Sequence, residues 1–129
     1  MKLKIEKFAR NLIKSVPKET WNIATKLEIE QADGRTDKTN IISQNGSIVY
    51  VAYADTTVLY VGESSKSIKR RFISDGNGSH RQANKHWYDK MTHVEFLKFE
   101  DTKLPEAYRK LLEQLLSVEF KPTNYGKKT

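Results

Sequence analysis

Two apolar segments, each containing a tyrosine, constrain the fold of this chain most. Tyr50 ends an Ile-Val-Tyr segment, and Tyr60, ten residues later, begins a Tyr-Val-Gly segment. β-branched and aromatic residues favour strands, and the Asp-Thr-Thr sequence over residues 55–57 has residue types that suit a turn. The sequence therefore predicts a β-hairpin over roughly residues 47–63.

Periodicity and end signals predict the other elements. Apolar residues at steps of three and four predict a helix over residues 3–16, which the proline at position 17 ends. Residues 21–31 fit either a strand or a helix end, and the polar residues 32–45 read as a loop or linker. Two helices follow the hairpin: one over residues 68–73, and a second that starts at Ser79, where Gln82 would complete a capping box. We then expect a third strand over residues 93–99. A last helix runs from Pro105 to the residues before Pro122.

This order of elements predicts an α+β fold. We expect a small, three-stranded, mainly antiparallel sheet flanked by helices, because the hairpin and the strand over 93–99 are separated and followed by helical patterns. The length of 129 residues favours one main domain. Residues 1–45 then form an N-terminal helical extension and linker, and residues 46–129 form the main domain.

The charge of the chain favours a polyanionic partner. Lys and Arg number 23 against 16 Asp and Glu, a formal net charge of +7. Basic side chains concentrate between positions 66 and 90, as a nucleic-acid-binding surface requires. The alternative is that the charge only solubilises the protein. The candidate nucleic-acid-binding residues are Lys66, Lys69, Arg70, Arg81 and Lys85.

Composition also excludes some classes of protein. The absence of cysteine excludes disulfides and thiolate-bound metal sites. No apolar run approaches the roughly 18 residues of a membrane span, and the N-terminus lacks the apolar block of a signal peptide. We therefore expect a cytoplasmic protein with no membrane partner.

The two tyrosine motifs and the elements that follow them resemble the GIY-YIG nuclease family. Tyr50 resembles the tyrosine of the first motif and Tyr60 that of the second, with Gly62 at the glycine that closes it. The family's next helix carries an arginine three residues after an apolar residue. Arg71 has this spacing, but one extra residue after Gly62 leaves Arg70 as an alternative.

The resemblance extends over roughly residues 46–126. Glu113 lies in a leucine-rich segment, nine residues before Pro122, and resembles the metal-binding glutamate of the family. Asn124 resembles the family's asparagine near the end of the domain, and His80 resembles a histidine of the homing-endonuclease branch. Glu119 is an alternative to Glu113.

The resemblance implies an endonuclease that hydrolyses DNA phosphodiester bonds with Mg²⁺ or Mn²⁺. Glu113 would bind the metal, since a hard cation can be held by one carboxylate and several waters. Arg71 would bind the scissile phosphate. Tyr50 would be the general base or position the water, with Arg71 and the metal lowering its pKa; His80 is an alternative base. The implied catalytic residues are Tyr50, Tyr60, Arg71, His80, Glu113 and Asn124.

Two departures from the family pattern leave other functions open. The first motif lacks its glycine, although Gly46 is near, and Glu63 stands where the excision-repair branch has a lysine. A carboxylate there either weakens phosphate binding or adds a metal ligand.

Two functions other than an endonuclease are therefore open. One is a non-catalytic nucleic-acid-binding module on the same fold, and the other is a small adaptor whose tyrosines only pack in the core. Cleavage of both DNA strands would need either a homodimer or two visits by a monomer.

Overall fold

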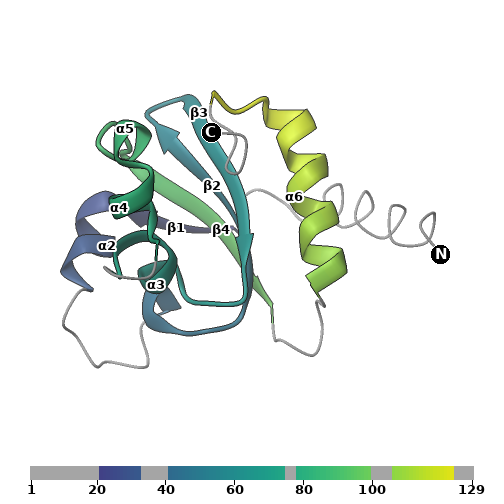
Figure 1. Ribbon diagram of the computed structural model, residues 1–129, viewed down its shortest axis with the longest axis horizontal. Coiled ribbons are helices and arrows are strands. Elements are labelled where there is room, and N and C mark those ends of the chain that lie inside the picture. The colour runs from purple at the N-terminus through teal and green to yellow at the C-terminus, as the bar shows by residue number, and fades with distance from the viewer. Residues whose placement is uncertain (1–20, 33–40, 75–77, 100–105, 124–129) are drawn as a thin grey trace.

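A four-stranded antiparallel sheet organises the chain (Figure 1). The computed structural model describes residues 21–32, 41–74, 78–99 and 106–123, apart from the side chains at positions 108 and 119. The strands are β1 (Asn22–Thr25), β2 (Ser47–Ala54), β3 (Thr57–Ser64) and β4 (His93–Phe99), in the spatial order β1-β4-β2-β3. The α+β class is confirmed. The expected helix over 3–16 lies outside the described residues.

The number of strands differs from our prediction of three. β1, from the segment that fitted either a strand or a helix end, pairs with β4 with Ile23 opposite Glu95. Residues 26–31 continue as helix α2 (Lys26–Gln31), which begins with a capping box. The Thr25 side chain accepts a hydrogen bond from the backbone N–H of Glu28, and the Glu28 carboxylate accepts one from the N–H of Thr25. β1 and α2 therefore join the sheet and its helical cover, although both lie within the expected N-terminal extension.

The predicted hairpin is confirmed as β2 and β3. Its two-residue turn has Asp55 in the left-handed region, with φ of 54°, a conformation that Asp tolerates better than most residues. The register sets Tyr50 opposite Gly62 and Ala52 opposite Tyr60. The two tyrosines therefore lie on the same face of the sheet, and their ring centroids are 6.2 Å apart.

Helices cover both faces of this sheet. Helix α6 (Glu106–Phe120) covers one face over β2 and β3. The short helices α2, α3 (Ile68–Ile73), α4 (His80–Ala83) and α5 (Lys85–Tyr88), with a 3₁₀ turn over Ile41–Ser43, cover the other (Figure 1). Among the described helices, none combines the length and apolar character needed to cross a membrane.

The alternation of side chains along β2 divides the buried residues into two cores. One core, under α6, joins Val49 and Val51 to Leu112 and Leu116. The other lies under the short helices and holds most of the buried aromatic residues. Its larger members are Ile29, Ile48, Tyr50, Tyr60, Ile68, Phe72, Trp87, Tyr88 and Phe96.

The helix predicted over residues 68–73 and the helix predicted to start at Ser79 differ in their capping. The Ser67 side chain accepts a hydrogen bond from the N–H of Arg70 at 3.0 Å, which caps α3. Ser79 precedes α4, but its side chain makes no capping hydrogen bond, so the predicted capping box with Gln82 does not form. The strand over 93–99 and the end of α6 before Pro122 agree with the sequence analysis.

Candidate active site

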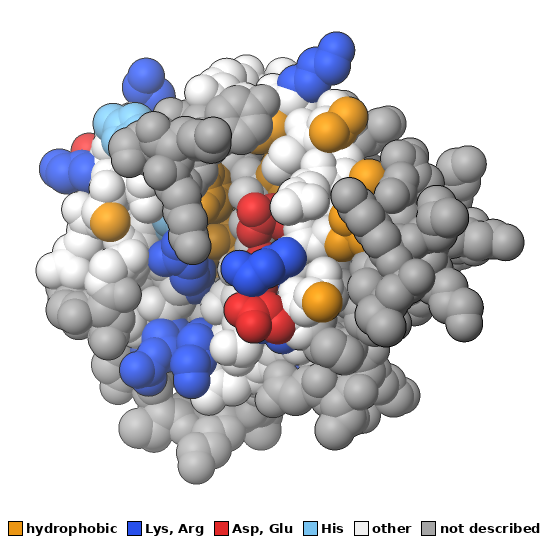
Figure 2. Space-filling view, turned by 45° about the vertical axis from the view of Figure 1, so that its right-hand side comes forward, with side chains coloured by type: hydrophobic (Ala, Val, Ile, Leu, Met, Phe, Trp, Pro, Cys, Tyr) orange, Lys and Arg blue, Asp and Glu red, His pale blue; other side chains and the backbone are white. Residues whose placement is uncertain are grey.

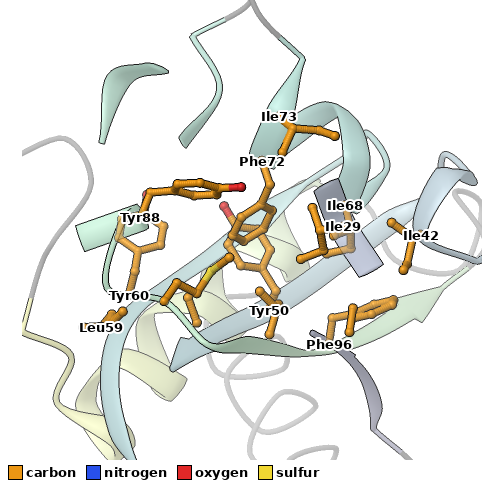
Figure 3. Packing of buried hydrophobic residues seen from close by; sticks show 14 of the residues in the cluster. Ile29, Ile42, Tyr50, Leu59, Tyr60, Ile68, Phe72, Ile73, Tyr88 and Phe96 are labelled. Carbon is orange, nitrogen blue, oxygen red and sulfur yellow. The ribbon is translucent and has the colours of Figure 1, made fainter. Parts of the chain in front are cut away.

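Tyr50 lies at the centre of the core under the short helices. It is fully buried in the middle strand β2, and its hydroxyl oxygen is 2.6 Å from Nε2 of His80. The ring of Phe72, from α3, meets the Tyr50 ring edge-on with centroids 5.1 Å apart (Figure 3). The first-motif tyrosine therefore has a fixed ring and a fixed polar partner.

His80 is held as firmly as its tyrosine partner. The ring is fully buried on α4, and its second nitrogen, Nδ1, is 2.9 Å from Nδ2 of Asn84. Three aromatic rings surround it, those of Tyr60, Phe72 and Trp87, with centroids 4.8, 4.8 and 4.7 Å away. Both ring nitrogens are thus engaged, one with the Tyr50 hydroxyl and one with a side-chain amide.

Gly62 is required by the position of the Tyr50 ring. A Cβ atom added to Gly62 would lie 2.4 Å from the Tyr50 hydroxyl oxygen and 2.5 Å from Cζ. Both distances are too short for non-bonded atoms, and a ring fixed in a packed core cannot move aside freely. The glycine that closes the second tyrosine motif therefore leaves the space in which the first tyrosine lies.

The structure separates the two candidate arginines. Arg71, half-buried on α3, donates from Nη1 to the carbonyl oxygen of Gly78 at 3.2 Å. Burial raises the pKa of Tyr60, and the positive charge of Arg71 opposes this rise. Arg70 is exposed on the same helix. Arg71 is therefore the arginine that lies beside the tyrosines and His80.

Glu113 belongs to the opposite layer from the tyrosines. It is half-buried on α6, next to Leu112, which packs against the sheet. Burial is the main cause of the raised pKa of Tyr50 and of Tyr60, and the negative charge of Glu113 adds to both rises. The alternative ligand Glu119 has a side chain outside the described residues.

Burial decides the protonation of the aromatic pair. Loss of solvation raises the pKa of Tyr50 well above 10, and the opposing positive charge of Arg71 does not reverse this. Burial likewise raises the pKa of Tyr60. Burial, and then the charge of Arg71, lower the pKa of His80 well below 6.5. At neutral pH the folded chain thus has two un-ionised tyrosines and a neutral imidazole. The charge of Arg71 lowers the pKa of Tyr50 as expected, but by less than burial raises it.

Glu63 has two basic partners that the sequence analysis missed. Its carboxylate accepts from Nε of Arg109 at 2.9 Å and lies 3.7 Å from Nζ of Lys110. Nη1 of Arg109 also donates to the Ser47 hydroxyl at 3.1 Å. These contacts offset the negative charge of Glu63. Arg109 lies 46 residues from Glu63, so no local pattern in the sequence indicated this pair.

The candidate nucleic-acid-binding residues fall into two groups. Lys66 and Arg70 are exposed and Lys69 is half-buried, all at or near α3. Arg81 instead donates to the carbonyl oxygen of Ile73 at 2.7 Å, and Lys85 pairs with Asp89 at 3.1 Å on α5. Figure 2 shows Lys and Arg side chains beside acidic ones on one face of the molecule. Lys66 and Arg70 thus offer exposed positive charge at or near α3, whereas Arg81 and Lys85 are engaged with other groups of the protein.

Glu113 is the carboxylate that the family resemblance implies as a metal ligand. Within the described ranges, no group of three or more His, Asp or Glu side chains could hold a metal ion. A cation held by a single carboxylate has to keep most of its water, as Mg²⁺ does. Asn124 lies outside the described residues.

The fold thus brings together Tyr50, Tyr60, Arg71 and His80 from β2, β3, α3 and α4, and the charge of Glu113, on α6, acts on both tyrosines. A comparison with protein-family models, curated proteins and solved structures found no match to this chain. The assignment of a function therefore rests on the geometry and chemistry of these five side chains.

The buried neutral His80 gives a pH-dependent stability. Because its pKa is lower in the folded than in the unfolded chain, the unfolded chain binds the proton first, and stability is lost as the pH falls below about 6.5. We expect His80→Gln to reduce the slope of the unfolding free energy between pH 6.5 and 5 by up to about 1.4 kcal/mol per pH unit. Urea titrations at several pH values measure this slope. His86→Gln, at an exposed position, is the control; equal slopes in wild type and His80→Gln would contradict the expectation.

Proposed function

We propose that this chain is a divalent-metal-dependent DNA endonuclease of the GIY-YIG type. The observation that carries the proposal is that two stacked tyrosines, a histidine and an arginine gather on one side of the sheet, with the charge of Glu113 on α6 acting on both tyrosines. Each of these residues resembles a family motif residue in its order along the chain, with one extra residue between Gly62 and Arg71. A purely structural cluster of aromatic residues would not need the charge of Arg71 beside it.

Each side chain has a role that its surroundings support. Arg71 binds the scissile phosphate and stabilises the charge that develops on it, since a guanidinium presents several N–H donors in a planar fork. Tyr60 lies beside Arg71 and positions the phosphate or the attacking water. Tyr50 is the general base or the residue that positions the water, and it has to overcome the rise in pKa that burial causes. His80 is the alternative base.

Glu113 would hold the metal. A bound Mg²⁺ or Mn²⁺ supplies Lewis-acid stabilisation of charge on the phosphate oxygens and favours a deprotonated water. The charge of Glu113 acts on the same two tyrosines as the charge of Arg71, which supports a metal position beside them. Mg²⁺ binding through one carboxylate is consistent with its preference for retaining water ligands.

DNA would approach along the exposed basic residues near α3. Lys66, Lys69 and Arg70 precede Arg71 or share its helix, so they can contact phosphates on either side of the scissile one. The pairing of Glu63 with Arg109 and Lys110 reduces its repulsion of this polyanion. Such contacts release counterions and make binding sensitive to salt.

The test compares two neighbouring arginines in a cleavage assay. Wild-type protein should cut plasmid or branched DNA with Mg²⁺ or Mn²⁺ and not with EDTA. Arg71→Ala should lower the cleavage rate by about 10² to 10³-fold, as for loss of a charge-stabilising donor. Arg70→Ala should change the rate by less than about threefold at low salt and reduce the salt dependence of binding by about one phosphate contact.

A second candidate is a nucleic-acid-binding module that does not cut. It is favoured by the complete burial of Tyr50, whose raised pKa opposes its use as a base. Salt-sensitive DNA binding by the wild type without cleavage in any metal would support this module over the nuclease. Absence of both binding and cleavage would support an adaptor. If duplex cleavage is found, sedimentation with DNA distinguishes a homodimer from a monomer that acts twice.

A further inference from the structure

With the amide nitrogen of Asn84 facing the His80 ring, as in the structure, the hydrogen-bond chain from Asn84 through His80 to Tyr50 has one consistent arrangement of hydrogens. A neutral imidazole carries one hydrogen, so one ring nitrogen donates and the other accepts. Nδ2 of Asn84, which can only donate, lies 2.9 Å from Nδ1 of His80. Nδ1 is therefore the acceptor, and the hydrogen is on Nε2, which lies 2.6 Å from the Tyr50 hydroxyl oxygen.

We propose that Asn84 is a positioning residue that fixes His80 in the Nε2–H tautomer, so that His80 donates a hydrogen bond to the Tyr50 hydroxyl oxygen. The backbone of Asn84 supports this role. Its N–H donates to the carbonyl of His80, and its own carbonyl accepts from the N–H of Trp87 and of Tyr88. Asn84 is thus anchored between α4 and α5, and its side chain has a defined position beside the buried ring.

The consequence for the reaction, which rests on the proposed function, is a choice between two bases. A donor to the phenolic oxygen favours the phenolate, so His80 opposes the effect of burial on Tyr50. With its hydrogen on Nε2, His80 cannot accept the hydroxyl proton of Tyr50. His80 then assists Tyr50 as a hydrogen-bond donor, and Tyr50, not His80, is the base or the water-positioning group.

Nitrogen-15 NMR of the imidazole rings tests this inference without DNA. Neutral tautomers are distinguished because protonated and unprotonated ring nitrogens have well-separated shifts. His86→Gln and His93→Gln, used singly, assign the three histidines. We expect wild-type His80 to have a hydrogen on Nε2 and none on Nδ1. A wild-type spectrum with the hydrogen on Nδ1 alone would overturn the proposal and make His80 the acceptor.

Two substitutions at position 84 test whether Asn84 causes this arrangement. In Asn84→Asp the carboxylate can only accept, so Nδ1 should gain a hydrogen; in Asn84→Ala the tautomers should mix. An unchanged His80 spectrum in both variants would overturn the role of Asn84. Thermal unfolding checks that each variant folds. If one of the variants does not fold, the wild-type spectrum still decides the tautomer of His80.

Cleavage assays keep the two proposals apart. Asn84→Asp should cut DNA at least about tenfold more slowly than wild type, as expected when a group that assists proton transfer is misdirected. A wild type with the expected tautomer that never cuts DNA would reject the nuclease and leave the assignment of Asn84 intact. A wild type that cuts DNA with the hydrogen on Nδ1 would reject only the role of Asn84.

Discussion

Replacing Glu113 by glutamine should reduce metal-dependent DNA cleavage by about 10³-fold while leaving DNA binding nearly unchanged. Glutamine keeps the shape of the side chain but removes the charge that a hard cation requires. Loss of roughly 4 kcal/mol of transition-state stabilisation, within the range that a metal supplies, corresponds to this factor. Plasmid cleavage with Mg²⁺ or Mn²⁺, together with a filter-binding assay, measures both quantities.

The same helix provides the control for this substitution. Glu106→Gln changes the same chemical group in the exposed first turn of α6, where Glu106 lies 3.8 Å from Lys110. It should cut DNA as the wild type does. If Glu113→Gln cuts at the wild-type rate, Glu113 is not the metal-binding residue, and Glu119→Gln becomes the next variant to measure.

Gly62→Ala should both destabilise the fold and disable the site. The new methyl group would lie 2.4 Å from the Tyr50 hydroxyl oxygen, so the ring has to move within a packed core. Overpacking of this kind destabilises proteins by about 3 kcal/mol, and a shift of about 1 Å in a catalytic group costs about 10²-fold in rate. Chemical denaturation and cleavage of plasmid DNA give the two effects.

A double-mutant cycle shows whether Tyr50 is the cause. In a Tyr50→Ala background the space beside Gly62 is open, so Gly62→Ala should cost much less stability there than in the wild type. A similar loss in both backgrounds would mean that the β3 backbone, and not the tyrosine ring, requires glycine at this position.

The parts of the fold that depend on local signals were predictable. The hairpin was predicted because two β-branched segments and a turn lie within about 17 residues. β1 was not predicted, because an alternation over four residues is too short to distinguish a strand from the end of a helix. Its pairing with β4 also joins distant parts of the chain, since Asn22 lies opposite Phe96, 74 residues later. α2 had a usable signal, since Thr25 and Glu28 have the spacing of a capping box.

The candidate site was predictable in its residue types but not in its environment. Spacing alone left Arg70 and Arg71 open; the orientation of α3 over the sheet separates them, because Ile68 and Phe72 are the residues that it buries. The protonation of Tyr50 depends on the helices that cover it, and the partners of Glu63 come from α6. Such long-range contacts leave no periodic signal in the sequence.

The division of the site between two layers has a consequence for the chain while it is still folding. The tyrosines, Arg71 and His80 belong to the core under the short helices, whereas Glu113 arrives with the helix that packs on the opposite face. If the proposed function holds, a partly folded chain in which that helix has not yet docked would have Arg71 and the tyrosines in place without the metal-binding glutamate. Nuclease activity would then require that both layers have folded, so molecules without a docked α6 would not cut nearby DNA.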